Sequence, residues 1–275
     1  MKIGLWSDCH NFPSLPLMKL SAYHKALGDS VSMYVPLEKY DIVYASKVFS
    51  FTPDIDDEYS VRADELRKGG YPDYSLYPKY KFAVGFLTRG CPRNCGFCVV
   101  GKKEGKCSRQ VAELSEFWRG QKMIKLLDPN ILACKDHEQL LQDLANSGAR
   151  VDFTQGVDIR LTTPDNIKLL NTVKTAIMHF AWDNPKEDLT EHFKRYAELL
   201  AIKSERNKAV YVLVNFNSTL DEDLYRIYTL RDFGYTPYVM IYQKETAPRE
   251  VRRLQRWCNC RWIFRSCSDF RGYKG

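Results

Sequence analysis

The sequence predicts an α/β protein built around parallel strands, and three observations support this fold class. From residue 81 onward, short apolar runs rich in Val, Ile, Leu and Phe alternate with longer segments in which apolar residues recur at helical spacing. The apolar runs are followed by Asp, Asn, Gly or Arg, residues that are typical of turns. With 275 residues, 44% of them hydrophobic and 27% charged, the chain can bury a large core. Strands that alternate with helices in this way usually form a parallel sheet.

Residues 1–60 predict a small α/β cap that precedes this region. The expected strands are 2–6, 31–35 and 40–45, and the expected helix is 15–26. The helix is predicted because Leu, Met, Ala and Tyr recur there at helical spacing and because Gly28 is a stop signal. Residues 61–80 follow as a connector, since they contain Gly, Pro and Tyr residues that interrupt regular elements.

Residues 81–258 predict six strands, each followed by a helix. The expected strands are 82–87, 123–127, 151–155, 175–181, 209–214 and 238–242. The expected helices are 112–118, 136–147, one that begins at Thr163 and Pro164, 187–204, 220–233 and 248–257. Pro164 suits a first helical turn, and Gly148 suits a helix end. Residues 259–275 form a basic C-terminal segment.

Composition limits the classes of function. No apolar run approaches the ~20 residues of a membrane span, and residues 1–8 are too poor in apolar residues for a secretory signal. We therefore expect a cytoplasmic protein that makes no membrane contact. In that reducing compartment, nine cysteines favour metal binding or catalysis over disulfides.

Three of these cysteines fall in one loop, directly after the first strand of the main region. Cys91, Cys95 and Cys98 have the spacing C-x3-C-x2-C. Three thiolates are one short of a closed zinc site and of the usual four-cysteine iron–sulfur site. A [4Fe–4S] cluster held by three cysteines keeps one iron open for a ligand. The alternatives are a zinc loop with a distant fourth ligand, or three ordinary thiols.

This loop, with the aromatic Phe97 just before its third cysteine, resembles the cluster loop of radical S-adenosylmethionine (SAM) enzymes. The resemblance covers roughly 81–258 and implies a partial (β/α)6 barrel, here with a short N-terminal α/β extension. It implies that Cys91, Cys95 and Cys98 hold a [4Fe–4S] cluster, and that Phe97 shields the cluster and helps to place adenine. In this family the reduced cluster cleaves SAM to a 5′-deoxyadenosyl radical, which abstracts hydrogen from the substrate.

Polar residues at the strand ends are the candidate SAM ligands, because chemistry in barrels of parallel strands gathers at the carboxyl ends of the strands. The candidates are Asp128, Gln155, Asp158, Arg160, Asp183 and Asn215. By the resemblance, Asp128 would accept hydrogen bonds from the SAM amino group, Arg160 would bind the SAM carboxylate, and Asp183 would reach the ribose. The structural alternatives are an Asp-Pro-Asn turn at Asp128 and a surface ion pair between Asp158 and Arg160. The match is incomplete, because Leu127-Asp128-Pro129 replaces a Gly-Gly-Glu and strand 209–214 lacks the glycines of the family. No residue is assigned to act on the substrate.

Near the N-terminus, Asp8-Cys9-His10 follows the first strand and resembles the cobalamin-binding D-x-H-x-x-G loop, although Pro13 replaces its glycine. Residues 1–60 are too few for the strands that enclose a cobalamin tail. The resemblance therefore implies a truncated relative of such a domain, and we do not expect cobalamin. The simpler expectation is that Asp8 and His10 cap the helix that follows.

Two further features leave alternatives open. Cys258, Cys260 and Cys267 could hold a second iron–sulfur cluster, or could pack as small apolar residues. Residues 244–275 contain nine Lys and Arg against three Asp and Glu, with Trp257, Trp262, Phe264, Phe270 and Tyr273 interleaved. This segment could bind nucleic acid through phosphate contacts and stacking, or could be a packed aromatic end piece beside a solvated helix face.

The predicted function is a radical SAM enzyme that abstracts hydrogen from an unidentified substrate, for methylation or methylthiolation of RNA or a peptide. Its partners would be SAM, a one-electron reductant such as flavodoxin or ferredoxin, and the substrate, with RNA among the candidates. Two alternatives belong to other classes. One is an iron–sulfur electron-transfer or sensor protein that does not use SAM, and the other is a zinc-loop module that binds nucleic acid.

Overall fold

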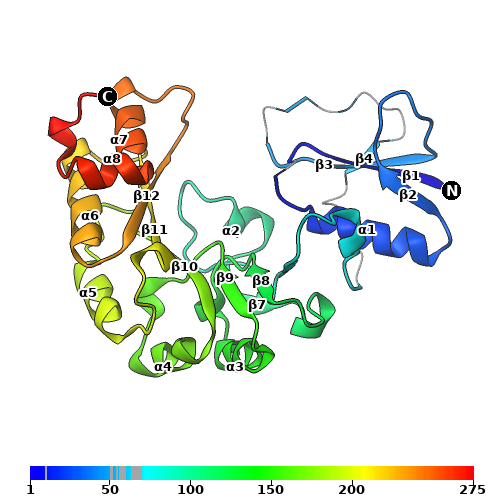
Figure 1. Cartoon of the computed structure of the whole chain (residues 1–275), viewed down its shortest axis with the longest axis horizontal. Coiled ribbons are helices and arrows are strands. Elements are labelled where there is room, and N and C mark those ends of the chain that lie inside the picture. Colours follow the sequence, from blue (N-terminus) through cyan, green and yellow to red (C-terminus); the bar gives the residue numbers. More distant parts are fainter. Residues whose placement is uncertain (10, 50–51, 54, 56–59, 63–69) are drawn as a thin grey trace. The chain divides into compact units, whose positions relative to one another are not determined.

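The computed structural model describes residues 1–9, 11–49, 52–53, 55, 60–62 and 70–275 (Figure 1). The chain forms two compact units. One consists of Met1–Gly85 with Glu113–Gln121, and the other of Phe86–Ala112 with Lys122–Gly275. The predicted boundaries after residues 60, 80 and 258 stay predictions, and residues 63–69 of the predicted connector lie outside the described residues.

The first unit contains a four-stranded sheet and one α-helix. The strands are β1 (Lys2–Ser7), β2 (Ser30–Met33), β3 (Ile42–Ser46) and β4 (Ser60–Arg62), all parallel and in the order β2-β1-β3-β4. Helix α1 (Leu15–Ala26) packs against this sheet. The buried core of the unit consists of Ile3, Leu5, Leu17, Leu20 and Tyr44. The expected strands and helix are therefore present, with slightly shifted ends.

The predicted capping role of Asp8 is wrong. The residue at the N-cap of α1 is Ser14, with Pro16 in the first turn. The Asp8 carboxylate instead accepts hydrogen bonds from the backbone amides of Val48 and Phe49, each at 2.8 Å. These amides follow β3, so Asp8 stabilises the exit from the neighbouring strand. His10 lies outside the described residues.

The larger sheet has six strands in the order β12-β11-β10-β9-β8-β5. They are β5 (Ala83–Gly85), β8 (Met123–Leu126), β9 (Arg150–Phe153), β10 (Thr175–Ala181), β11 (Lys208–Val214) and β12 (Thr236–Ile241). Neighbouring strands from β8 to β12 pair in parallel. The prediction of an α/β protein with parallel strands is therefore confirmed.

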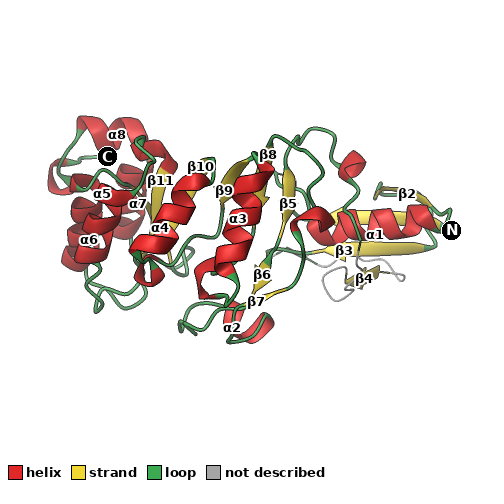
Figure 2. Ribbon diagram, turned by 90° about the horizontal axis from the view of Figure 1, so that it is seen from below, coloured by secondary structure: helices red, strands yellow, loops and turns green. Residues whose placement is uncertain are grey.

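Helices cover one face of this sheet. They are α3 (His137–Ser147), α4 (Pro164–Thr172), α5 (Thr190–Leu199), α6 (Leu220–Asp232) and α7 (Arg249–Asn259). A further short helix, α8 (Arg261–Ser266), packs against α7. Figures 1 and 2 show α3 to α6 along the same face. Side chains of β10 alternate accordingly, because Met178 and Phe180 are buried whereas Ile177 and His179 are partly exposed. Among the described residues, no helix combines the length and the apolar character that a membrane crossing needs.

Several helix ends follow the sequence signals. Gly148 ends α3 in the left-handed conformation, with φ of 65°. Thr163 and Asn166 form a capping box at the start of α4, where Pro164 occupies the first turn. These ends depend on local backbone chemistry, which explains why the sequence alone indicates them.

The predicted helix over 112–118 is wrong. The segment contains only a 3-10 turn, η2 (Leu114–Glu116). Glu113 and Glu116 close a capping box around this single turn, and the chain then leaves the helical conformation at Phe117. Other 3-10 turns are η1 (Tyr74–Leu76), η3 (Ile131–Ala133), η4 (Ile159–Leu161), η5 (Glu205–Asn207) and η6 (Phe270–Gly272).

Helix α5 is shorter than predicted, since it ends at Leu199 and not at Ser204. The Asn171 side chain donates a hydrogen bond to the Leu199 carbonyl at 2.9 Å and accepts one from the Ala201 amide at 2.8 Å. These two bonds satisfy backbone groups that another helical turn would have paired. The contact comes from α4, so no local signal within 187–204 reveals it.

The C-terminal aromatic residues form a packed end piece. Trp257 on α7 is fully buried, and its ring centroid lies 4.8 Å from that of Phe264 and 5.6 Å from that of Phe270. The Trp257 indole also donates to the Cys267 carbonyl at 2.9 Å. For these three aromatic residues, packing is the observed arrangement.

A buried cation ties α6 to the ends of two strands. The Arg226 side chain is 1% exposed and pairs with Asp223 at 2.5 Å. It also donates to the carbonyls of Trp182 at 2.6 Å and Leu213 at 3.0 Å. Trp182 directly follows β10 and Leu213 belongs to β11, so Arg226 fixes the carboxyl ends of both strands.

We expect Arg226→Met to lower the free energy of unfolding by about 3–5 kcal/mol, because it leaves Asp223 buried without its partner. Urea unfolding followed by circular dichroism measures this. The control is Lys168→Ala, which removes a pair with Asp165 in which the lysine side chain is 78% exposed. That variant should change the free energy by less than about 1 kcal/mol. Equal losses in both variants would contradict the role given to Arg226.

Candidate cysteine-loop site

A short hairpin closes the predicted cysteine loop at its base. Strand β6 (Thr88–Arg89) pairs antiparallel with β7 (Arg109–Gln110). Glu104 accepts from the Arg89 guanidinium at 3.2 Å and from the Gly90 amide at 3.3 Å. The loop therefore has backbone and side-chain support of its own.

The loop requires glycine at its first position. Gly90 has φ of 89°, and a Cβ atom there would lie 2.2 Å from the Cys107 carbonyl oxygen. That distance is far below van der Waals contact, and the obstructing atom belongs to the backbone. Only glycine combines this conformation with such a close approach. Position 90 thereby lets the two ends of the loop meet.

The three predicted ligands gather on this loop. The Cys91 amide donates to the Gly105 carbonyl at 3.1 Å, and the Cys98 amide donates to the Cys95 carbonyl at 3.0 Å. The second of these bonds forms a tight turn, after which helix α2 (Val100–Lys103) begins. All three cysteines are partly exposed. The thiols of Cys91 and Cys98 both lie within electrostatic reach of Cys95.

The charges around Cys95 have opposing effects. Burial raises the pKa of its thiol above the ordinary value, and Arg160 acts in the opposite direction. Asp183 and the other two thiols raise the pKa further. Because a thiol must lose its proton to bind a metal, Arg160 is the neighbour that favours binding.

Among the residues that the structure describes, no three His, Cys, Asp or Glu side chains are arranged to surround a metal ion. A tetrahedral zinc site needs ligands that converge on a single point. The three cysteines thus share one loop and one electrostatic environment without such convergence.

Asp128 holds the start of the loop. Its carboxylate accepts hydrogen bonds from the Leu87 amide at 3.1 Å, the Thr88 amide at 2.5 Å and the Thr88 hydroxyl at 2.7 Å. Burial raises the pKa of Asp128 to about 6, whereas these hydrogen bonds lower it. The contacts occupy both carboxylate oxygens, and the predicted contact of Asp128 with SAM stays a prediction.

Asp158 connects the cysteine loop to the segment after β9. One of its oxygens accepts from Arg93 Nε at 2.6 Å, and the other accepts from Arg160 Nε at 2.7 Å. Arg160 also donates from Nη1 to Glu187 at 2.8 Å. Burial opposes ionisation, but the Arg160 and Arg93 guanidinium groups hold the pKa of Asp158 below its ordinary value. Asp158 is therefore an anion at neutral pH, and it balances the charges of the Arg93 and Arg160 guanidinium groups.

Asn130 was not assigned as a ligand from the sequence, yet it reaches the cysteine loop. Its Nδ2 atom donates to Asp158 at 3.2 Å and lies 3.6 Å from Cys91 Sγ. Its Oδ1 atom is buried and has no hydrogen-bond partner within the described part of the chain. The sequence signal is the position of Asn130 after a strand end, but Asp-Pro-Asn also reads as a simple turn.

Asp183 follows β10 and lies near both the loop and the buried Arg226. Its carboxylate accepts from the Leu213 amide at 3.2 Å. Burial raises the pKa of Asp183 to about 6, while that hydrogen bond, Arg226 and Arg160 act to lower it. The structure thus brings Asp183, Asp158 and Arg160 together with the cysteines.

Phe97 joins the loop to the ends of β11 and β12. Its ring packs edge-to-face on Phe216 with centroids 5.6 Å apart, and Phe216 packs on Tyr242 at 4.9 Å. Asn215 adopts φ of 64° and donates from Nδ2 to the Tyr242 carbonyl at 2.8 Å. Gln155 is exposed. The SAM contacts expected of Phe97, Asn215 and Gln155 stay predictions.

The three C-terminal cysteines have a different environment. Cys258 is buried, and its Sγ atom lies 3.5 Å from the Pro237 carbonyl oxygen. Burial raises the pKa of this thiol, which disfavours the thiolate. The Cys267 thiol donates to the Asp269 carbonyl at 3.2 Å. A second cluster at Cys258, Cys260 and Cys267 stays a prediction.

A polar row that was not predicted from the sequence lies on the sheet face opposite α3 to α6. Lys125 donates to Asp152 at 2.8 Å, and His179 stacks on Tyr211 with centroids 5.2 Å apart. His179 Nδ1 donates to the Phe153 carbonyl at 3.0 Å, and burial lowers the pKa of this ring. The imidazole is therefore neutral with its lone pair on Nε2. The available signal was a polar residue at alternate positions of otherwise apolar strands.

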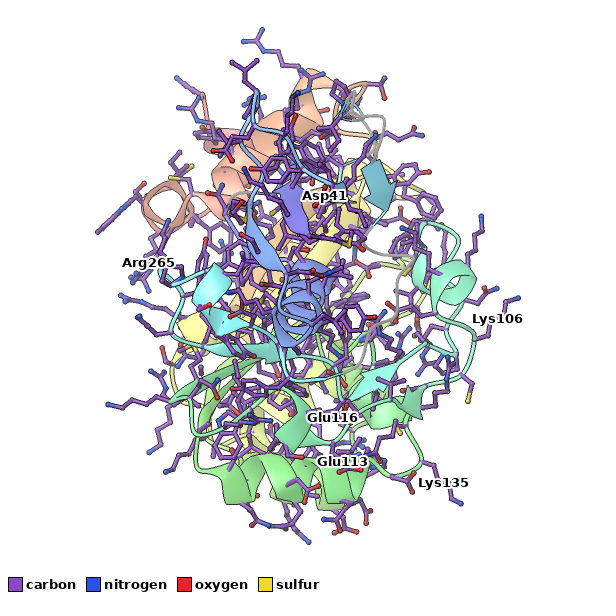
Figure 3. The ribbon with its side chains drawn as sticks, turned by 90° about the vertical axis from the view of Figure 1, so that its right-hand side faces the viewer. Asp41, Lys106, Glu113, Glu116, Lys135 and Arg265 are labelled. Atoms are coloured by element: carbon purple, nitrogen blue, oxygen red, sulfur yellow. The ribbon has the colours of Figure 1, made fainter. Side chains whose placement is uncertain are left out.

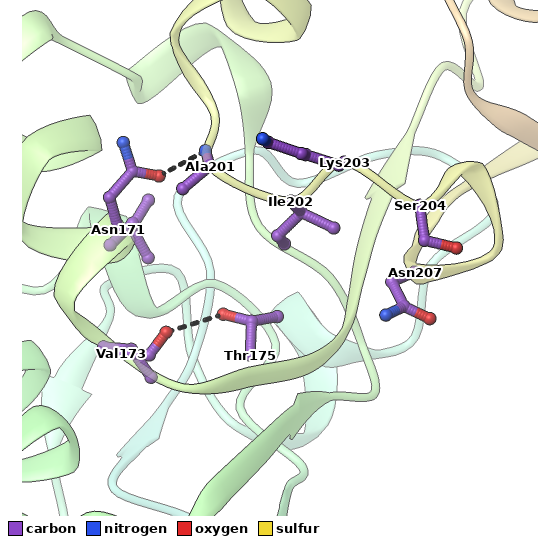
Figure 4. Close-up of a pocket in the computed structure, with 9 residues that line it drawn as sticks. Asn171, Val173, Thr175, Ala201, Ile202, Lys203, Ser204 and Asn207 are labelled. Carbon is purple, nitrogen blue, oxygen red and sulfur yellow. Dashed lines mark hydrogen bonds between the residues drawn. The ribbon is translucent and has the colours of Figure 1, made fainter.

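A cavity of about 230 Å³ lies at the other end of β10 (Figure 4). Thr175, the first residue of β10, lines it together with the chain that follows α5. Its lining consists of Leu170, Asn171, Val173, Thr175, Ala201, Ile202, Lys203, Ser204 and Asn207. Since the candidate ligands follow the carboxyl ends of the strands, this cavity is separate from the cysteine-loop site.

Comparison with known proteins identifies no family. No protein-family model matches the chain, and no curated protein matches it significantly.

We expect Asp128→Asn to lower the free energy of unfolding by about 1–3 kcal/mol, because an amide NH2 group would face donors of Leu87 and Thr88. Urea unfolding at neutral pH measures the loss. The control is Asp136→Asn, since Asp136 is exposed and its side chain does not cap α3. The control should stay within about 0.5 kcal/mol of the wild type.

The effect of Asp128→Asn should also depend on pH. The folded-state pKa of Asp128, about 6, lies above the ordinary value of 3.8. Its contribution to stability is therefore complete below the ordinary pKa and is lost as pH rises through the folded-state pKa. The loss caused by Asp128→Asn should be larger at about pH 4 than at about pH 7. A loss that is constant over this range would show that Asp128 does not titrate with a raised pKa.

Proposed function

We propose that this protein is a radical SAM enzyme and that its larger sheet is a partial (β/α)6 barrel. One observation carries the proposal: Cys91, Cys95 and Cys98 share a C-x3-C-x2-C loop in which the Cys95 thiol lies near the other two and near Arg160. The parallel strands with helices along one face support the barrel. The carboxyl ends of such strands are where barrel enzymes bind their substrates.

The donor set fits a [4Fe–4S] cluster with one open iron. In such a cluster each thiolate binds a different iron, so the cysteines need not surround one point as zinc ligands do. Gly90 and Asn94 have φ of 89° and 48°, which bends the loop sharply on either side of Cys91. Asn130 Nδ2, at 3.6 Å from Cys91 Sγ, is a hydrogen-bond donor to the sulfur. Such hydrogen bonds tune the potential of a cluster.

When bound, the cluster and SAM supply a 5′-deoxyadenosyl radical that abstracts hydrogen from the substrate. The residues of this chain bind and orient SAM. Arg160 uses Nε for Asp158 and Nη1 for Glu187, which leaves Nη2 for the carboxylate of the methionyl group. Phe97 and Phe216 offer an apolar wall for adenine.

The SAM amino group fits Asn130 better than Asp128. Leu87 and Thr88 already donate to both oxygens of Asp128. Asn130 Oδ1, in contrast, is buried and has no partner among the described residues. A buried oxygen without a hydrogen bond costs about 1–3 kcal/mol. An ammonium group donating to Asn130 removes that cost.

The substrate fits against the polar row opposite α3 to α6. Asp152 Oδ1 is buried and has no hydrogen-bond partner within the described residues, and the neutral His179 presents a lone pair on Nε2. Both groups accept hydrogen bonds, so this face suits a substrate with O–H or N–H groups. Methylation or methylthiolation of RNA or a peptide, and a flavodoxin or ferredoxin reductant, remain our expectations for that substrate and its electron source.

The test compares two matched triple variants under anaerobic conditions. Wild type, Cys91/Cys95/Cys98→Ala and Cys258/Cys260/Cys267→Ala are reconstituted with iron and sulfide, and bound iron is counted. SAM and dithionite are then added, and 5′-deoxyadenosine is measured. We expect about four irons in the wild type and in the C-terminal variant, and 5′-deoxyadenosine only from these two proteins.

Other results would change the assignment in defined ways. Iron retained in full by the loop variant would remove Cys91, Cys95 and Cys98 as the ligands. A cluster that never yields 5′-deoxyadenosine would point to an electron carrier. Zinc in place of iron, lost from the loop variant alone, would make the loop a zinc site.

Arg160→Ala should weaken SAM binding to the reconstituted protein by about 1.5–3 kcal/mol, the contribution of a hydrogen bond to a charged group. Isothermal titration measures it. Arg195→Ala is the control, because Arg195 is an exposed arginine on α5. Urea unfolding of both variants separates weaker binding from a weaker fold, since Arg160 also pairs with Asp158. An unchanged affinity would limit Arg160 to a structural role.

A further inference from the structure

One tryptophan of the basic C-terminal segment stays outside the aromatic end piece. Trp257 is 0% exposed, whereas Trp262 on α8 is 80% exposed. A single exposed apolar side chain is common on protein surfaces. Whether the exposed indole of Trp262 belongs to a binding surface therefore depends on the residues around it.

Those neighbours are cations. Arg265 lies four positions after Arg261 and three after Trp262, so its side chain is adjacent to both on the surface of the helix. Arg206, in η5, lies close enough to Arg261 for the two charges to repel each other. Desolvation lowers the pKa of Arg261, and the charges of Arg206 and Arg265 lower it further. Figure 3 shows Arg265 at the surface beside the ribbon. Arg206, Arg261, Trp262 and Arg265 form the Trp262 patch.

One carboxylate offsets these three cations only in part. Glu205 Oε2 lies 3.9 Å from Arg265 Nη2, and both side chains are more than half exposed. An ion pair of this length in solvent contributes little. The Trp262 patch therefore keeps an excess of positive charge beside a flat aromatic surface.

The packing of α8 holds this patch in place. Phe264, on another side of the same short helix, packs on the buried Trp257 at 4.8 Å. The Cys267 carbonyl, just after the helix, accepts from the Trp257 indole at 2.9 Å. Since these contacts fix α8, a ligand of the Trp262 patch meets side chains on an ordered element.

We propose that the Trp262 patch binds single-stranded nucleic acid. The guanidinium groups of Arg206, Arg261 and Arg265 contact phosphates, and the Trp262 indole stacks on an unpaired base. This inference goes beyond the proposed function, because none of the four residues belongs to the cysteine-loop site. It depends neither on a cluster nor on SAM.

The combination of groups favours this partner over others of the same charge. Phosphates relieve the repulsion between neighbouring guanidinium groups, and so would the carboxylates of an acidic peptide. A peptide that carries only acidic side chains, however, has no ring that stacks on the exposed indole. A duplex keeps its base faces stacked, so it too leaves the indole without a partner. Of these three ligands, only an unpaired strand offers both phosphates for the arginines and free base faces for the Trp262 indole.

The test uses a fluorescein-labelled oligouridylate of about twelve nucleotides, within the site sizes known for single-strand binding folds. The full chain is titrated and followed by fluorescence anisotropy between about 50 and 200 mM KCl. Trp262→Ala should weaken binding about 5- to 150-fold, the range for loss of one base-stacking contact. Trp262→Phe should restore most of the affinity.

The arginines are tested through salt dependence. A variant with Arg261→Ala and Arg265→Ala should reduce the slope of log affinity against log salt by about 0.7 for each lost phosphate contact. Lys168→Ala removes an exposed cation from α4 and should leave both slope and affinity unchanged. Circular dichroism of each variant confirms that the fold is retained.

Three results would overturn the proposal. They are no binding by the wild type at about 50 mM KCl, equal affinity of the wild type and Trp262→Ala, and tighter binding of a duplex than of the single strand. Competition by polyglutamate that is equal in the wild type and Trp262→Ala would reduce the patch to a charged surface and also contradict it. Because no cluster is needed, these outcomes are independent of the test for 5′-deoxyadenosine.

Discussion

The candidate site depends on the buried carboxylate of Asp158. It accepts hydrogen bonds from Arg93 in the cysteine loop, from Arg160 after β9 and from Asn130 after β8. A buried charge is costly unless it is paired, and removal of one partner leaves part of that buried charge uncompensated. The loop therefore cannot move away from the sheet without breaking a charged hydrogen bond of Asp158. Charge pairing at Asp158 therefore helps to set where the cysteines lie.

The same arrangement recurs along the carboxyl edge of the larger sheet. Asp128 supports the entry to the cysteine loop, and Arg226 supports the ends of β10 and β11. Asp183 lies between Arg226 and the loop, within reach of Arg160 as well. Burial of Asp128 and Asp183 raises each pKa to about 6, so two carboxylates at the edge that holds the site change charge near neutral pH.

The two faces of the sheet have different roles for a related reason. Met178 and Phe180 point toward the helices, where removal of apolar surface from water stabilises the fold. His179, between them on β10, points to the other face and joins Asp152 in the polar row. Helix α8 divides in the same way, with Phe264 packed on the buried Trp257 and Trp262 in solvent. In both elements the repeat of side-chain directions along the backbone separates residues that stabilise the core from residues available to a ligand.

The sequence by itself determined the parallel α/β architecture, the cysteine spacing and helix ends such as Gly148, because periodicity and backbone conformation are local properties. It also marked Asp128 and Asp158 as strand-end carboxylates. Only the tertiary structure decided that Asp128 bonds to a residue 40 positions away and Asp158 to one 65 positions away. The early end of α5, the unpaired oxygen of Asn130 and the polar row likewise depend on distant neighbours. Sequence patterns indicate which side chains are polar, but the path of the whole chain decides which polar atoms meet.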